Sequence, residues 1–261
     1  MAARSTEAVQ DAVLAWYGQN RRDLPWRHTR DPYAILVSEV MLQQTHVSRV
    51  VPRYLDWLRR WPTAAALADA SPAEVICAWA GLGYNRRAVN LHRCAQAVVR
   101  LGGFPRDPSD LRRLPGIGPY TAAAVACFAF GAQVAAPDVN ARRVLSRALG
   151  DPDASPPPGR AYGWNQALFD LGSTVCIARR PRCGLCPLRD GCPSAGMTFA
   201  PLRRQSRFEG SFRQRRSRVL RRLVDSGPLA VGELDREALD ALVADGLAVV
   251  SDGTAALPAA V

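Results

Sequence analysis

The chain has 261 residues, of which 48% are hydrophobic and 22% are charged, as expected of a folded protein with one large or two small domains. Its first residues lack the apolar core of a signal peptide, and no apolar run is long enough to span a bilayer, so we expect a cytoplasmic protein. The net charge of +11 favours a polyanionic partner such as nucleic acid. All 34 basic residues are arginine, which excludes any mechanism in which a lysine side chain forms a Schiff base.

From Thr6 to Gly150 the sequence alternates apolar segments at helical spacing with breaks at proline or glycine. The predicted helices cover 6–19, 33–50, 72–80, 86–101, 119–130 and 138–149. The breaks lie at Pro52, Pro62, Pro72, 81–83, 102–103 and 115–116. Because this region has no alternating strand pattern, we predict an all-α fold class. A further helix over 161–175 leads to a group of cysteines.

After Pro201 the composition changes. Residues 203–218 are rich in arginine, and they run into a basic amphipathic helix predicted over 213–227. A second helix is predicted over 236–246, followed by a short apolar stretch with a turn at Asp252-Gly253. Two helices and a terminal hairpin indicate a small winged-helix-like module, with a plain helical extension as the alternative.

Four cysteines lie within seventeen residues, in the pattern C-x₆-C-x₂-C-x₅-C. They are Cys176, Cys183, Cys186 and Cys192. Four thiolates can hold either a 4Fe–4S cluster or a structural zinc, although zinc ribbons usually contain two C-x₂-C pairs and this run contains one. Cys77, Cys94 and Cys127 stand singly in apolar patterns, and we expect them in the core.

Two carboxylates and a glycine turn are candidates for chemistry. Glu39 interrupts an apolar helix, where it lies either on the exposed face or buried as a general acid. Asp138 stands where an aspartate caps a helix, a role compatible with catalysis. The turn LPGIG at 114–118 opens a helix at Pro119. Its backbone amides and the helix N-terminus can hold a phosphate, as in a helix-hairpin-helix motif, or the turn merely joins two helices.

Eight motifs occur in one order along the chain. They are RDLPWR (22–27), SEVMLQQT (38–45), GLGY (81–84), NLH (90–92), LPGIGPYT (114–121), D-x-N-x-x-R (138–143), NQAL-x-DLG (165–172) and the cysteine pattern. Over roughly residues 5–200, this order resembles that of the MutY-type adenine DNA glycosylases. They belong to the superfamily of helix-hairpin-helix DNA glycosylases that includes endonuclease III.

The resemblance implies a fold of two helical lobes with DNA in the cleft between them and a 4Fe–4S cluster on the four cysteines. A six-helix barrel lobe with the helix-hairpin-helix would span 30–137. Residues 1–29 and 138–200 would form the cluster lobe, and 203–261 the arginine-rich extension. The implied partner is double-stranded DNA containing a mispaired or lesion-paired base, and we expect a monomer at the nucleoid that does not bind membranes.

The resemblance also implies a reaction, in which adenine opposite 8-oxoguanine or guanine is flipped out and its N-glycosidic bond is hydrolysed. Glu39 would protonate the adenine ring at N7 and later assist water, while Asp138 would stabilise the oxocarbenium-like sugar, as paired carboxyls do in glycoside hydrolases. Tyr120 occupies the position where bifunctional relatives carry a lysine. We therefore expect a monofunctional enzyme without lyase activity.

The residues implied to contact substrate or DNA come from several of these motifs. They are Arg22, Leu24, Trp26, Arg27, Leu42, Gln43, Gln44, Val47, Tyr84, Gly116, Gly118 and Gln166. Among them, Gln44 and Tyr84 match residues that wedge into the base stack beside the opposite base. Gly116 and Gly118 would offer amides to a phosphate.

The chain departs from the family pattern at two places. Asn85 stands where many relatives have a tyrosine, and the C-terminal residues do not look like the Nudix-like domain that recognises 8-oxoguanine in long members. A thymine or uracil mismatch glycosylase of the same fold is the nearest alternative function. A redox-sensing iron–sulfur DNA-binding protein without catalysis is a second one, but it leaves Glu39 and Asp138 without a shared purpose.

Overall fold

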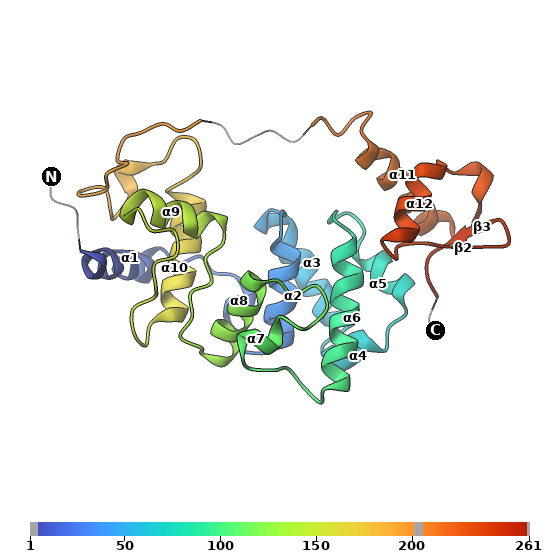
Figure 1. Cartoon of the computed structure of the whole chain (residues 1–261), viewed down its shortest axis with the longest axis horizontal. Helices are drawn as coiled ribbons and strands as arrows, with labels where there is room; N and C mark the ends of the chain where they lie inside the picture. The colour runs from blue at the N-terminus through green and yellow to red at the C-terminus, as the bar shows by residue number, and fades with distance from the viewer. Residues whose placement is uncertain (1–4, 201–205, 260–261) are drawn as a thin grey trace. The chain divides into compact units, whose positions relative to one another are not determined.

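The computed structural model describes residues 5–200 and 206–259, and within them the chain is predominantly helical (Figure 1). The helices before the C-terminal module are α1 (Thr6–Asn20), α2 (Pro32–Leu42), α3 (Val47–Arg60), α4 (Ala64–Ala68), α5 (Pro72–Trp79), α6 (Arg86–Arg100), α7 (Pro108–Leu111), α8 (Pro119–Phe130), α9 (Val139–Leu149) and α10 (Ala161–Thr174). Short 3₁₀ helices lie at η1 (Pro25–Arg27), η2 (Cys183–Leu185) and η3 (Val231–Glu233). The predicted all-α fold class is confirmed. None of the described helices is long and apolar enough to cross a membrane.

Local chemistry accounts for many of the helix ends. Helix α5 begins at a capping box, in which the Ser71 hydroxyl accepts from the Glu74 amide and the Glu74 carboxylate accepts from the Ser71 amide. Helices α8 and α9 end at Gly131 and Gly150, both with φ of 74°. This left-handed conformation favours glycine, so the sequence itself places these two ends.

The single helix predicted over 33–50 is wrong, because α2 and α3 are separate helices. The chain turns between them, and Gln44 adopts a left-handed φ of 54° there. The break also lies earlier than predicted, since α3 continues through Pro52. The cause is a distant side chain, Arg87, whose guanidinium binds carbonyl groups at the end of α2.

The chain divides into two compact units. The first unit draws on Met1–Ile35, Arg106–Arg112 and Gly118–Arg204, and the second on Leu36–Pro105, Arg113–Ile117 and Gln205–Val261. The lobe boundaries implied by the family resemblance, 30–137 and 1–29 with 138–200, stay a prediction.

The core of the first unit is enclosed by α1, α9 and α10. Val13, Trp164 and Leu171 are completely buried in it. A Cβ atom added at Gly172 of α10 would lie 2.8 Å from the Asn140 backbone oxygen of α9. Glycine is therefore required where these two helices approach each other.

The second unit holds a group of packed tryptophans and the helices α3 to α6. Trp57 contacts Trp61 and Trp79 edge to face, with ring centroids 4.7 and 5.5 Å apart. Helices α4 and α5 both pack against α6 (Figure 1). Of the cysteines expected in the core of either unit, Cys94 and Cys127 are buried, whereas Cys77 is half-buried.

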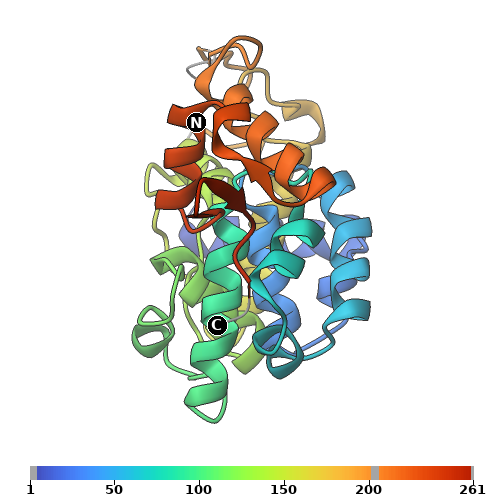
Figure 2. The same ribbon diagram turned by 90° about the vertical axis from the view of Figure 1, so that its right-hand side faces the viewer.

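A C-terminal module follows, comprising α11 (Phe212–Ser226), β1 (Leu229–Ala230), α12 (Arg236–Ala244), β2 (Val249–Ser251) and β3 (Thr254–Ala256). Figure 2 shows α12 and the β2–β3 hairpin of this module. Its strands form an antiparallel sheet in the order β1-β3-β2, with Ala255 opposite both Leu229 and Val250. The predicted turn at Asp252-Gly253 joins β2 to β3, with φ of 49° and 71°. The winged-helix-like prediction is confirmed in its order of elements, although residues 203–205 and 260–261 of the predicted extension lie outside the described residues.

Candidate active site and cysteine cluster

The four clustered cysteines line one cavity in the first unit. Four thiolates around one cavity suit a four-iron cluster, in which each iron takes one thiolate. Burial raises the pKa of the Cys186 thiol to about 11, and the positive charge of a bound metal centre would favour its thiolate form. The donor set therefore fits a 4Fe–4S cluster.

An arginine on α9 supports the cysteine loop. The Arg147 guanidinium donates to the carbonyl oxygens of Ile177 and Ala178, at 2.9 and 2.5 Å, and approaches the Cys176 sulfur at 3.5 Å. It also stacks over the Phe199 ring, 3.5 Å from the ring centroid. This guanidinium thus joins both ends of the loop that carries the thiolates.

Asp138 is linked to the same loop through a chain of hydrogen bonds. Its carboxylate caps α9 by accepting from the amides of Asn140 and Ala141, at 2.9 and 2.7 Å, and from the Asn140 side chain at 2.8 Å. The Asn140 side-chain oxygen accepts from Arg143, which also donates to the Cys176 carbonyl at 2.9 Å. Capping is confirmed, and this network explains the asparagine and arginine of the D-x-N-x-x-R pattern, to which sequence reasoning gave no role.

The other candidate catalytic side chains differ in burial. Glu39 lies on α2 with 5% of its surface exposed, and its neighbour Ser38 is completely buried. The exposed-face alternative for Glu39 is therefore wrong. Tyr120, in the first turn of α8, is half-buried, and its ring centroid lies 6.2 Å from that of Phe169.

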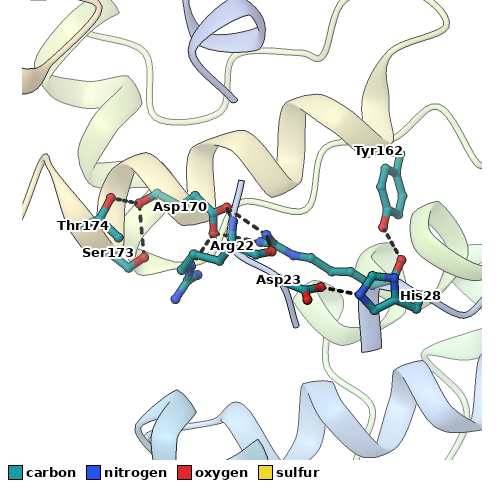
Figure 3. A network of polar contacts seen from close by, with 8 residues as sticks. Arg22, Asp23, His28, Tyr162, Asp170, Ser173 and Thr174 are labelled. Carbon is teal, nitrogen blue, oxygen red and sulfur yellow. Dashed lines mark hydrogen bonds and ion pairs between the residues drawn. The ribbon is translucent and has the colours of Figure 1, made fainter. Parts of the chain in front are cut away.

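Arg22 and Arg27, implied to contact substrate or DNA, both bind the buried carboxylate of Asp170 on α10. Figure 3 shows Arg22 beside Asp170. Arg27 donates to both Asp170 oxygens at 2.8 Å, and Arg22 donates its Nε at 2.6 Å and its backbone amide at 3.0 Å. Burial alone would raise the pKa of Asp170, but these hydrogen bonds and positive charges hold it below its usual value. These ion pairs to Asp170 fix η1 on α10, so the buried residues Leu24 and Trp26 have a defined position.

Arg87 organises the segments that carry Gln44 and Tyr84 in the second unit. Its guanidinium donates to the carbonyl oxygens of Val40 and Met41 in the last turn of α2 and of Gln43 just after it, and to that of Gly83 before α6. Burial without an acidic partner lowers the pKa of Arg87 to about 10. Gln44 and Tyr84 are left-handed, with φ of 54° and 48°, and both are exposed. Arg87 therefore holds in place two exposed residues whose left-handed backbone conformation is strained.

The glycine turn has the geometry that a close backbone approach requires. Gly116 has a φ of 75°, and a Cβ atom there would lie 2.6 Å from the Asn90 Cβ. Gly118 is the N-cap of α8, with extended backbone. The N-terminus of α8 carries the positive end of the helix dipole, which favours an anion near the turn.

The remaining predicted site residues are distributed between the units. Leu42, Gln43 and Val47 are half-buried in the second unit, and Gln166 is 5% exposed on α10 of the first. The residues that sequence reasoning missed are Asp170, Arg87, Asn140 and Arg143. The only sequence signal for Asp170 is that it is a charged residue within the otherwise apolar run ALFDLG.

Comparison with known protein families gives two matches. The model described as "HhH-GPD superfamily base excision DNA repair protein" matches residues 37–160. The model described as "Iron-sulfur binding domain of endonuclease III" matches residues 176–192, the run with the four cysteines. The iron–sulfur prediction is confirmed, and the zinc alternative is set aside.

The chain is 46% identical to the adenine DNA glycosylase of Mycolicibacterium smegmatis, covering 94% of each protein. It is 45% identical to that of Mycobacterium tuberculosis over 94% of this chain and 92% of the relative. The human adenine DNA glycosylase is 43% identical over 71% of this chain and 39% of its own length.

Solved structures show the same fold. A thermostable thymine-DNA glycosylase matches with a TM-score of 0.66 and 31% identity over 72% of this chain and 94% of its own. An endonuclease III–DNA complex matches with a TM-score of 0.63 and 22% identity over 74% of this chain and 97% of its own. The chain therefore belongs to the HhH-GPD superfamily of base excision DNA repair proteins and, within it, to the adenine DNA glycosylases with an endonuclease III-type iron–sulfur motif.

Proposed function

We propose that the protein is a monofunctional DNA glycosylase of base excision repair, which hydrolyses the N-glycosidic bond of adenine paired with 8-oxoguanine or guanine. The observation that carries this proposal is the burial of Glu39 within the apolar helix α2. A carboxyl shielded from water is suited to donate a proton to a base. The identity to adenine DNA glycosylases over 94% of the chain supports adenine as the base.

The reaction assigns one step to each carboxyl group. Glu39 protonates N7 of the flipped adenine, so that the bond between N9 and the sugar carbon breaks with its electrons leaving on the base. The Asp138 carboxylate stabilises the positive charge that develops on the sugar. Water then attacks the sugar carbon and gives its proton to Glu39. Tyr120 completes the catalytic group, and the absence of lysine from the sequence leaves no side-chain amine for a lyase step.

The remaining roles concern binding. The amides at Gly116 and Gly118 hold a DNA phosphate, and the 4Fe–4S cluster on the four cysteines stabilises the basic loop at Arg179–Arg182. The protein acts as a monomer on double-stranded DNA at the nucleoid. The arginine surplus supports DNA as the partner, because phosphate neutralisation dominates such affinities.

The test is single-turnover base release by cluster-loaded protein on duplexes with adenine opposite 8-oxoguanine, guanine, cytosine or thymine. We expect Glu39→Gln to slow adenine release by about 1000-fold and to leave the duplex Kd within about threefold of the unsubstituted value, because only the proton donor is lost. Glu7→Gln is the matched control, since it makes the same chemical change at an exposed position on α1. Normal base release by Glu39→Gln would refute the assigned general acid.

The structural match to a thymine-DNA glycosylase supplies a second candidate function. That enzyme shares the fold at 31% identity, lower than the 46% found with an adenine DNA glycosylase. Duplexes with G:T and G:U pairs in the same assay separate the two. Release of thymine or uracil without release of adenine would replace the proposed substrate while keeping the fold and the carboxyl chemistry.

A further inference from the structure

A polar cavity in the second unit is lined by residues that are far apart in the sequence. Gln44 comes from the segment after α2, and Tyr84 from the segment before α6. Arg216 on α11 and Asp245 at the end of α12 come from the C-terminal module. The module therefore supplies part of the cavity wall beside Gln44 and Tyr84, two exposed residues with a left-handed backbone conformation.

Apolar packing and ion pairs fix the module at this position within the second unit. Leu239 and Leu242 of α12 share a core with Ile76 of α5 and Val89 of α6. Asp245 accepts from the Arg216 guanidinium and lies 3.7 Å from that of Arg86, at the start of α6. The module is thus built onto the helices that border the cavity.

The cavity wall carries more positive than negative charge. Three arginines, Arg86, Arg87 and Arg216, line the cavity together with a single carboxylate. Its net positive charge suits a nucleotide, which brings a negative phosphate.

A guanidinium beside a carboxylate can distinguish 8-oxoguanine from guanine. The major-groove edge of guanine presents two acceptors, N7 and O6. In 8-oxoguanine, N7 carries a hydrogen and becomes a donor beside the O6 and O8 acceptors. An arginine that donates to an oxygen and an aspartate that accepts from N7–H complement this edge, whereas the same aspartate would face a lone pair on guanine.

We propose that Arg216 and Asp245 of the C-terminal module contact the base opposite the excised adenine and favour 8-oxoguanine over guanine. This inference rests on the proposed function and adds to it the specificity-determining residues. The family resemblance implies that Gln44 and Tyr84 wedge into the base stack, which would bring the opposite base to the pair. Asp245 retains acceptor capacity after binding its arginines, because a carboxylate accepts about four hydrogen bonds.

The test compares the Kd of the full-length protein for two duplexes. Each contains non-cleavable 2′-fluoro-2′-deoxyadenosine, opposite either 8-oxoguanine or guanine. We expect the unsubstituted protein to bind the 8-oxoguanine duplex about tenfold or more tightly, as one charge-assisted contact allows. Asp245→Asn should reduce this preference to about threefold or less, and Arg216→Gln should weaken binding to both duplexes.

Two further variants control for the loss of a positive charge and for unfolding of the module. Arg221→Ala removes a positive charge from an exposed position on the same helix, outside the cavity, and should keep the preference. Asp245→Glu keeps the charge that pairs with Arg216 but displaces the carboxylate, so it should lose the preference even if Asp245→Asn unfolds the module. Folding of each variant is checked by thermal unfolding.

Failure of this inference differs from failure of the proposed function. Equal binding of both duplexes by the unsubstituted protein, or an unchanged preference in folded Asp245→Asn and Asp245→Glu variants, would overturn the role of the pair. Absence of adenine release from any cleavable duplex would overturn the proposed function, and the binding comparison would still decide the contact to the opposite base.

Discussion

Arg87 offers the sharpest test of how the second unit holds its exposed loop residues. The Nη1 and Nη2 atoms of its guanidinium donate to four carbonyl oxygens and to the Thr45 hydroxyl, over distances of 2.7 to 3.2 Å. The carbonyls of Val40 and Met41 lie in the last turn of α2, where no helical partner exists. Replacing Arg87 with alanine leaves all five acceptors to water.

The number of hydrogen bonds that Arg87 makes sets the expected loss in the free energy of unfolding. Each hydrogen bond contributes about 1 kcal/mol net, and water entering from the cavity can satisfy part of the vacated set. We expect Arg87→Ala to lower the free energy of unfolding by about 3 kcal/mol. Arg87→Lys should recover only part of this, because an ammonium cannot span both segments as a planar guanidinium does.

The assay is urea denaturation of the cluster-loaded protein, with base release measured in parallel. We expect adenine release to fall by about 10- to 100-fold for Arg87→Ala, since Gln44 and Tyr84 lose their fixed positions. Arg100→Ala, an exposed arginine at the end of the same helix, is the matched control. A loss of stability below about 1 kcal/mol would refute this account of Arg87.

Two further predictions concern the first unit and the glycine turn. Asp170→Asn should destabilise the protein by about 3–5 kcal/mol, because it leaves two arginines beside a buried position without their charge partner; thermal unfolding measures the loss. Since the folded pKa of Asp170 is depressed, its stabilising contribution should be complete above its unfolded pKa of about 4 and disappear as the pH falls through the folded pKa, and Asp170→Asn should lack this dependence. Gly116→Ala should weaken binding of duplex DNA by about tenfold, because a Cβ would clash with Asn90 and the left-handed backbone would be strained. Fluorescence anisotropy measures that Kd, with Gly103→Ala, at a φ of 150° and with open space around it, as a control for the glycine change alone.

Several features could be predicted from the sequence because they are local. The cysteine spacing fixes the ligand set, since four thiolates within seventeen residues can surround one centre. Asp138 caps α9 through amides two and three residues away. The Asp252-Gly253 turn, likewise, depends only on residues that tolerate a left-handed backbone.

Other features depend on partners distant in the chain, and only the tertiary structure decides them. The break between α2 and α3 contradicts the apolar periodicity, because Arg87 binds the carbonyls where the helix would have continued. The net positive charge indicated a nucleic-acid partner, but Arg22 and Arg27 are bound to Asp170, more than 140 residues away. Charge in a sequence shows how many cations are present, and folding decides which of them remain available to a ligand. The meeting of Arg216 and Asp245 with Gln44 and Tyr84 at one cavity is likewise a product of long-range packing, which no local pattern of residues encodes.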